Sequence, residues 1–303
     1  MLGDVRPHRV LAALAVVVTA LAACTTPAEQ RAARQSAEQA TSTQAPATTT
    51  TTTTTAPTRT APPKTTTAAA TTTAWVVGAK PLPLRPDGFG QVLPTPPELV
   101  NRSLPTADLL PPPRTDAYAS TVSAVPRDVL ARSTWRPECP VAAADLRYLT
   151  MSFWGFDGRH HTGEMIVHER VADGITRVFG RLHALRFPLE EMRVTDAPEL
   201  DLHPTGDGNN TTAFVCRPAV NQTTWSAHAS GLAVDVNPFC NPYIRGNLVL
   251  PELASSYVDR SWRRPGMVFR GDGVVKAFAA AGWSWGGDWS SPVDIQHFTA
   301  TGR

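Results

Sequence analysis

The most informative part of this chain runs from residue 225 to residue 238 and reads Trp225-Ser226-Ala227-His228-Ala229-Ser230-Gly231-Leu232-Ala233-Val234-Asp235-Val236-Asn237-Pro238. From Gly231 onward apolar and other residues alternate, which predicts a short strand over residues 231–237. Alternation sends Asp235 to the face opposite the apolar side chains. A turn at Gly231 can bring His228 and Asp235 together, and a neutral imidazole and a carboxylate are ordinary zinc ligands.

A second polar group lies near the C-terminus. The stretch Gly282-Trp283-Ser284-Trp285-Gly286-Gly287-Asp288-Trp289 is followed by Asp294-Ile295-Gln296-His297-Phe298. Asp294 and His297 are three residues apart, and on a helical turn this spacing puts both side chains on one side. One can bind a metal ion while the other holds the attacking water. With His228 and Asp235 they provide the parts of a catalytic zinc site: three ligands, an open position and a base.

These residues also have structural interpretations. His228 and Asp235 could form a hydrogen-bonded pair without metal, and a lone His297 would ordinarily be structural. The tryptophans of the second segment could stack on a substrate or pack around the site. Structural roles are expected for Asp288, for His160 and His161 as solvated turn residues, and for His168, His183 and His203. The helical zinc-protease signature His-Glu-x-x-His is absent from the sequence.

The pattern around these segments predicts an α+β fold. Residues 146–156 are rich in aromatic and β-branched side chains, which indicates a strand. Residues 167–185 carry apolar side chains at helical spacing, which indicates an amphipathic helix against the core. A short helix is expected over residues 274–281, ending at Gly282. Strands and helices mix without a regular βαβ period.

The N-terminus has the pattern of a bacterial export signal. Basic side chains within residues 6–9 precede an apolar run, Val10 to Leu21, that is short for a membrane span. The run ends in Leu21-Ala22-Ala23-Cys24, which resembles the lipobox of bacterial lipoproteins. We therefore expect residues 1–24 to be a lipoprotein signal and Cys24 to carry a lipid anchor on the outer face of the cell membrane. An ordinary secretory signal is the alternative.

The next two segments are poor in core-forming side chains. Residues 25–75 are dominated by Thr, Ala and Pro and are expected to form a disordered tether, able to span on the order of 150 Å when extended. Residues 76–117 are Pro-rich but carry apolar side chains, so we expect either an arm against the domain or further linker. The compact domain is expected over residues 118–303.

Charge and cysteine content narrow the function further. The 303 residues include 28 basic and 26 acidic side chains, a net charge of +2, and no Lys/Arg run that would bind nucleic acid. No obligate protein partner is evident. Apart from Cys24, three cysteines remain: Cys139, Cys216 and Cys240. One disulfide and one free thiol is the simplest arrangement outside the cytoplasm, and spacing cannot choose among the three pairs.

The two motifs carry a family resemblance. Ser-x-His-x-x-Gly-x-Ala-x-Asp, followed by Gly-Trp-x-Trp-Gly-Gly and then Asp-x-x-His-Phe, resembles the VanY-like zinc peptidases. That family contains D-alanyl-D-alanine carboxypeptidases and L-alanyl-D-glutamate endopeptidases that act on peptidoglycan. The resemblance covers about residues 135–300 and extends to the segments around Cys139, Gly155 and Cys216. It implies a small antiparallel sheet with flanking helices, as in Hedgehog and DD-peptidase-like folds.

The resemblance implies a role for each site residue. His228, Asp235 and His297 match the zinc ligands, and Asp294 matches the general base that activates the attacking water. Arg217 is the candidate for stabilising the oxyanion, with Arg193 as its competitor. Ser226 is expected to support the site. Because Cys139 and Cys216 fall in family-like segments, the resemblance favours a disulfide between them and leaves Cys240 free.

The resemblance predicts zinc-dependent hydrolysis of an amide bond in the stem peptides of peptidoglycan. The carboxypeptidase branch commonly has Glu at the base position, so Asp294 favours the endopeptidase branch and the L-alanyl-D-glutamate bond. The alternative is a catalytically silent, zinc-containing module that binds the cell wall. Asp294 argues against that alternative, because a binding module needs the ligands but not the base.

Overall fold

The computed structural model describes residues 75–302. The expected signal over residues 1–24, its Cys24, and residues 25–74 of the expected tether lie outside the described residues. Within residues 75–302, no helix has the length and apolar character needed to span a bilayer.

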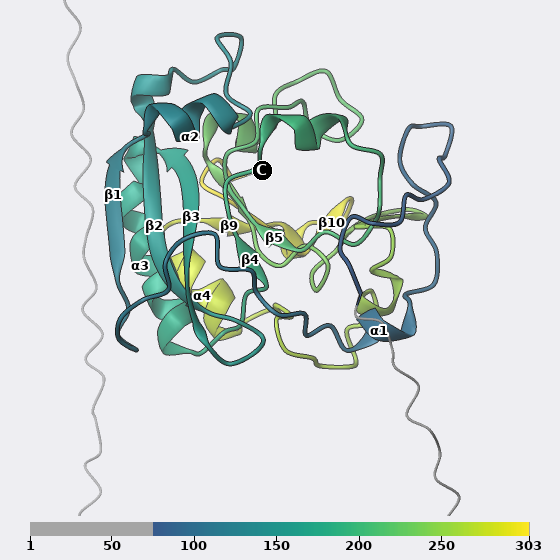
Figure 1. Ribbon diagram of the computed structural model, residues 1–303. Coiled ribbons are helices and arrows are strands. Elements are labelled where there is room, and N and C mark those ends of the chain that lie inside the picture. Colours follow the sequence, from purple (N-terminus) through teal and green to yellow (C-terminus); the bar gives the residue numbers. More distant parts are fainter. Residues whose placement is uncertain (1–74, 303) are drawn as a thin grey trace, which may run out of the picture. The chain divides into compact units, whose positions relative to one another are not determined.

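The largest sheet is built around the aromatic and β-branched segment that begins at residue 146. Its three antiparallel strands lie in the order β1-β2-β3 (Figure 1) and are β1 Ser120–Ala124, β2 Leu146–Trp154 and β3 His160–His168. A turn containing Gly158, at φ 72°, joins β2 to β3. The strand predicted over residues 146–156 is confirmed for residues 146–154, and residues 155 and 156 belong to the turn that follows. We did not predict β3, and its residue His161 is buried rather than solvated, because its ring bonds to Asp108 and Asp157.

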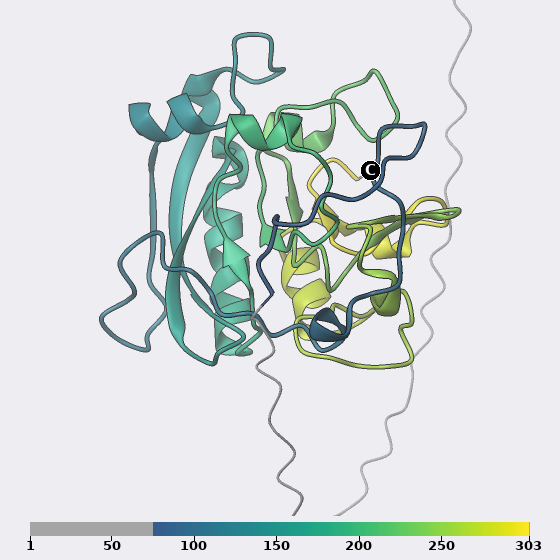
Figure 2. The same cartoon turned by 45° about the vertical axis from the view of Figure 1, so that its right-hand side comes forward.

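Helix α3, Ala172–Ala184, lies against one face of this sheet (Figure 2). Its buried side chains recur at helical spacing and include Ile175, Phe179 and Leu182. The helix predicted over residues 167–185 is therefore confirmed in its body. Its predicted start is wrong, because residues 167 and 168 belong to β3 and a 3₁₀ turn, Glu169–Val171, precedes the helix.

Helix α4, Gly273–Ala280, packs beside α3. It begins at Asp272, whose side chain accepts a hydrogen bond from the backbone N–H of Val275. It ends before Gly282, where φ is 81°. The predicted short helix is thus confirmed to within one residue.

The remaining strands form three small sheets. One has the antiparallel order β6-β11-β9 and a second has the antiparallel order β10-β7-β8, while β4 and β5 form a parallel pair. Their bounds are β4 Glu191–Met192, β5 Asn210–Thr211, β6 Ala233–Asp235, β7 Tyr243–Arg245, β8 Leu248–Leu250, β9 Ser284–Trp285, β10 Val293–Asp294 and β11 His297–Thr299. The short helices are α1 Pro97–Val100 and α2 Arg127–Arg132. The α+β prediction is confirmed, with the strands divided among several small sheets.

The main hydrophobic core joins the large sheet to the sheet β6-β11-β9. It includes Met151 from β2, Phe179 from α3, Phe278 from α4, Val234 from β6 and Phe298 from β11. The rings of Phe278 and Phe298 stack with centroids 3.8 Å apart. Because β6 and β11 each place residues in this core, their outward-facing side chains are held in fixed positions.

Residues 75–117 pack against the rest of the described chain. The Trp75 indole N–H donates to Asp207 (2.8 Å), and the backbone N–H of Gly90 donates to Glu252 (2.7 Å). Arg102 is fully buried and forms two hydrogen bonds with Glu190, of 2.5 and 2.6 Å. Burial alone would lower the pKa of Arg102, but the bonds and charge of Glu190 raise it. Arg102 therefore stays charged and ties this segment to the domain.

A disulfide joins Cys139 to Cys216, and Cys240 is free and buried. This is the pairing that the family resemblance favours. The backbone N–H of Cys216 also donates to Thr134 (2.9 Å). Because Cys216 directly precedes Arg217, the bridge fixes the start of the loop that carries Arg217. Burial raises the pKa of the Cys240 thiol to about 12, so this thiol is neutral and unreactive.

Candidate metal centre and active site

His228 lies in a short 3₁₀ helix, Ala227–Ser230. The hydroxyl of Ser226 accepts a hydrogen bond from the His228 backbone N–H at the start of this helix. Gly231 ends the helix in the left-handed region at φ 66°, and an added Cβ would lie 2.6 Å from the backbone nitrogen of His168. Only glycine fits this turn. The chain therefore turns at Gly231 and continues into β6, which covers residues 233–235 of the strand predicted over residues 231–237.

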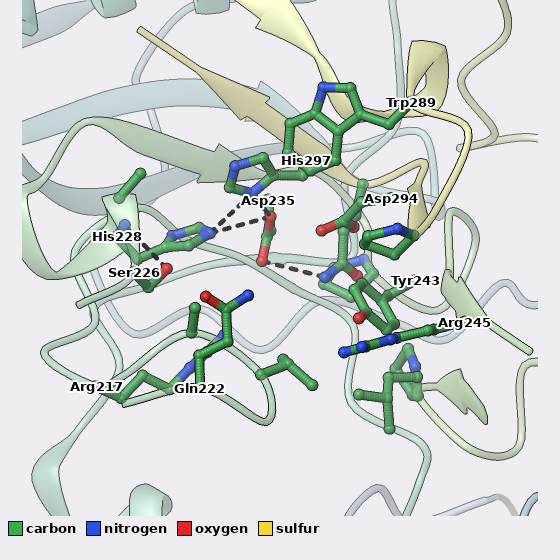
Figure 3. A pocket seen from close by; sticks show the side chains of 18 of the residues that line it. Arg217, Gln222, Ser226, His228, Asp235, Tyr243, Arg245, Trp289, Asp294 and His297 are labelled. Carbon is green, nitrogen blue, oxygen red and sulfur yellow. Dashed lines mark hydrogen bonds and ion pairs between the residues drawn. The ribbon is translucent and has the colours of Figure 1, made fainter. Parts of the chain in front are cut away.

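Asp235 and His297 meet across two paired strands. Asp235 ends β6 and His297 begins β11, and the two residues are directly opposite in the antiparallel register. Opposed residues of an antiparallel pair point to the same face with Cβ atoms about 4.5–5.5 Å apart. Asp235 Oδ1 lies 3.0 Å from His297 Nδ1 and 3.2 Å from His228 Nε2. His228 Nε2 lies 3.1 Å from His297 Nδ1 (Figure 3).

Proton positions at His228 follow from its partners. Its Nδ1 lies 2.6 Å from the carbonyl oxygen of Ala213, which can only accept a hydrogen bond, so Nδ1 carries the proton. When the ring carries no second proton, its Nε2 lone pair points at the carboxylate of Asp235. Two acceptor atoms 3.2 Å apart repel unless a cation or proton lies between them. A metal ion bound by both atoms would remove this repulsion.

The three facing atoms fit a zinc ion. His228, Asp235 and His297 are the group of potential metal ligands that the described residues bring together, and all three are buried. Tetrahedral ligands at about 2.0–2.1 Å from zinc are about 3.3 Å from one another. The separations of 3.0, 3.1 and 3.2 Å are close to that value. Two imidazoles and one carboxylate are also a donor set that zinc accepts while keeping a position open.

Gln296 orients the carboxylate of Asp235. Its side-chain amide donates to Asp235 Oδ2 at 3.2 Å, which leaves Oδ1 facing the two histidines. Burial by itself would raise the pKa of Asp235, but the charges and hydrogen bonds of His228 and His297 hold it below its ordinary value. The carboxylate is therefore ionised and ready to bind a cation.

Asp294 lies in β10, opposite Tyr243 of β7, and its side chain faces the same cavity as the three candidate ligands (Figure 3). The prediction that Asp294 and His297 share a helical turn is wrong. The chain turns at residues 295 and 296, so that the two residues lie on short strands of different sheets. They nevertheless both line the cavity, because the turn folds β10 and β11 around it.

The carboxylate of Asp294 is poised for proton transfer. Its Oδ1 is buried and has no hydrogen-bond partner among the described residues. Burial raises the pKa of Asp294 to about 7, against smaller opposing effects of His297 and Arg217. A carboxylate with this pKa can take up and release a proton near neutral pH.

The Trp/Gly-rich stretch packs against the short segment that runs from Asp294 to His297. A Cβ added to Gly286 would lie 2.6 Å from the backbone oxygen of Asp294 and 3.3 Å from the Cβ of His297. The indole N–H of Trp285 donates to the carbonyl of Ile295 (2.8 Å), between Asp294 and His297. Trp283 and Trp285 are buried, while Trp289 lines the cavity with its ring 5.4 Å from that of His297. Asp288 is half-exposed and pairs with Arg270, as expected for a structural residue.

The site opens into a cavity of about 860 Å³. One wall is the loop after the disulfide, which carries Arg217 and Trp225, and the opposite wall is β7, with Tyr243 and Arg245 (Figure 3). A cavity of this size accommodates a peptide segment. The site is thus a buried group of ligands and an unpaired carboxylate at the side of an open, polar cavity.

The two candidate arginines lie in different places. Arg217 lines the cavity, and its charge acts on Asp294. Arg193 forms ion pairs with Glu191 (2.8 Å) and Glu199 (2.6 Å) and is not among the residues that line this cavity. Arg217 is therefore the one of the two that faces the site.

Three features of the site were not predicted from the sequence. The carbonyl of Ala213 orients His228, but a backbone contact leaves no trace in side-chain identity. Gln296 sits inside the Asp-x-x-His motif, and its neighbour His297 was the only available signal. Arg245 lies outside both motifs, in a strand that the sequence analysis did not separate from the surrounding loop.

Residues 220–300 match a family model described as D-alanyl-D-alanine carboxypeptidase. The matched segment contains His228, Asp235, Asp294 and His297. The match supports the broad family resemblance drawn from the two motifs and the assignment of this part of the chain as peptidase-like. Neither the curated proteins nor the solved structures give a significant match.

Proposed function

We propose that this protein is a zinc-dependent peptidase that hydrolyses an amide bond in the stem peptides of peptidoglycan. The observation that carries the proposal is the buried triangle of His228, Asp235 and His297 beside the unpartnered carboxylate of Asp294. Three ligands alone would also suit a structural metal site. A buried carboxylate without a hydrogen-bond partner lowers the stability of the fold, and such groups are typical of functional sites.

His228 Nε2, Asp235 Oδ1 and His297 Nδ1 would hold the zinc ion. When bound, zinc supplies Lewis-acid polarisation of the scissile carbonyl and lowers the pKa of the attacking water. Ala213 and Gln296 fix the directions in which His228 and Asp235 present their ligand atoms.

Asp294 would move the proton. Its carboxylate accepts a proton from the attacking water and delivers it to the nitrogen of the departing amine. The guanidinium of Arg217 stabilises the negative charge that develops on the carbonyl oxygen. The ring of Trp289 lies next to His297 on one side of this centre, and Tyr243 of β7 lies opposite Asp294 on another.

The site of action is part of the proposal. The lipobox-like sequence ending at Cys24 supports an exported protein anchored by lipid to the outer face of the cell membrane. The Thr/Ala/Pro-rich composition of residues 25–75 supports a tether that lets the catalytic domain reach into the cell wall. The partners expected there are stem peptides, with the membrane contacted through the lipid.

The test is digestion of purified, muramidase-treated peptidoglycan by the zinc-loaded full chain, with products identified by mass spectrometry. Wild type is expected to release peptide fragments whose masses name the bond. Asp294→Ala with equal zinc content is expected to release none, while Asp288→Ala keeps wild-type activity. If wild type and Asp294→Ala both bind zinc and neither cuts, the cell-wall-binding module becomes the better interpretation.

A further inference from the structure

Arg245 is a cation in the cavity that the proposed mechanism does not use. It lines the cavity, is solvent-exposed, and has no hydrogen-bond or ion-pair partner within residues 75–302. Many other arginines of this chain are matched to carboxylates: Arg85, Arg102, Arg132, Arg147, Arg193 and Arg270. An unpaired guanidinium directed into a cavity is available to a ligand anion (Figure 3).

Strand geometry places Arg245 relative to Asp294. Tyr243 of β7 is directly opposite Asp294 of β10, so their side chains share a face. Arg245 is two residues beyond Tyr243 on the same strand, and alternation puts it on that face as well. Arg245 therefore lies on the same cavity wall as Asp294. Along β7 it is about 6.6–6.8 Å from Tyr243, the residue opposite Asp294. Arg217 comes from the loop on the opposite wall.

This wall is where the released half of the substrate must lie. Asp294 can pass a proton to the departing amine only if that nitrogen is next to its carboxylate. The substrate residue that contains this nitrogen then extends along the cavity wall toward Arg245. In both candidate bonds this residue, D-alanine or D-glutamate, carries an α-carboxylate on the carbon next to the nitrogen. A guanidinium recognises such a carboxylate through two parallel hydrogen bonds.

We infer that Arg245 is a specificity-determining residue that binds the α-carboxylate of the residue released by the cut. The inference rests on the proposed function and adds a requirement to it: the substrate carries a free carboxylate on the amine side of the scissile bond. A substrate with a carboxamide at that position leaves Arg245 without its partner and is cut more slowly.

Three synthetic stem pentapeptides test this with the zinc-loaded full chain. The parent is L-alanyl-γ-D-glutamyl-L-lysyl-D-alanyl-D-alanine. In the second peptide the α-carboxylate of D-glutamate is a carboxamide, and in the third the C-terminal carboxylate is a carboxamide. Products of the parent identify the bond cut and therefore the released residue. One amidated peptide then probes Arg245, and the other is its internal control.

Wild type is expected to cut the peptide amidated on the released residue about 10- to 100-fold more slowly in kcat/KM than the parent, mainly through KM, because a charge-assisted contact is lost. The other amidated peptide is expected to be cut at the parent rate. Arg245→Gln is expected to cut the parent about 10- to 100-fold more slowly and to abolish the discrimination, for the same reason. Arg245→Lys is expected to recover part of the discrimination. Arg177 is an exposed residue of α3 that does not line the cavity, and Arg177→Gln is expected to behave as wild type.

Each outcome has one meaning. If wild type cuts all three peptides equally, or if Arg245→Gln keeps the discrimination, the role of Arg245 is wrong and the proposed function stands. If Arg245→Gln slows all three peptides by the same factor, Arg245 supports the fold or the reaction and does not read the carboxylate. If wild type cuts none of the peptides and no peptidoglycan, the proposed function fails, and this inference fails with it.

Discussion

Replacing Asp294 by asparagine should stabilise the metal-free protein while abolishing its activity. The buried carboxylate has its pKa raised from 3.8 to about 7, and the largest cause is loss of solvation. The folded state therefore holds this proton more tightly than the unfolded state. Stability from this group is present at low pH and is lost as the pH rises from about 4 to about 7.

The magnitude follows from that shift. About three pKa units at about 1.4 kcal/mol per unit set an upper bound of about 4 kcal/mol at pH 8. An asparagine side chain at this position would keep the shape of the aspartate and carry no charge. We expect Asp294→Asn to raise the free energy of unfolding by about 2–4 kcal/mol at pH 8 and to leave it nearly unchanged below pH 4.

Urea denaturation of wild type and Asp294→Asn, with a chelator and over a series of pH values, measures this difference. Asp288→Asn is the matched control, because Asp288 is half-exposed and its substitution should change stability by less than about 1 kcal/mol. Saturating zinc should shrink the advantage of Asp294→Asn, since a cation beside the site favours the ionised carboxylate. An advantage that is absent at pH 8, or equal at pH 4 and pH 8, would refute the assignment of Asp294 as a buried, poorly solvated base.

Three further substitutions test the supports of the site. Gln296→Ala frees the Asp235 carboxylate and should weaken zinc affinity about 10- to 100-fold in a competition titration, whereas Gln222→Ala at the cavity rim should not. Gly286→Ala places a Cβ against the backbone of Asp294 and should cost about 1–3 kcal/mol of unfolding free energy together with activity; wild-type behaviour would show that the packing is loose. Glu190→Gln removes the counter-charge of buried Arg102 and should cost about 3–5 kcal/mol in urea denaturation, against less than about 1 kcal/mol for Glu138→Gln at an exposed pair.

The sequence predicts those parts of this protein whose residues interact locally. His228, Gly231 and Asp235 lie within one turn and strand, so their approach could be worked out from alternation and from the glycine. The helix α3 was predictable because its apolar side chains repeat with the helical period. The helical turn predicted for Asp294 and His297 is wrong, because a three-residue spacing fits a helical turn and also a tight connection between short strands.

Other features depend on partners distant in the chain. The burial of His161 depends on Asp108, which lies 53 residues away, and the burial of Arg102 depends on Glu190, 88 residues away. No local pattern around His161 or Arg102 signals either contact. The position of Arg245 in the site depends on the pairing of β7 with β10, which places it on the same cavity wall as Asp294 and which the sequence does not predict.

Activity as a function of bound zinc tests the central claim most directly. The full chain is stripped with a chelator, zinc is added back in known amounts, and cleavage of muropeptides is measured at each ratio. The account predicts that stripped protein is inactive and that activity rises linearly to a break at one zinc per chain, with no recovery for His297→Ala. Full activity in the stripped protein, or wild-type recovery in His297→Ala, would contradict it.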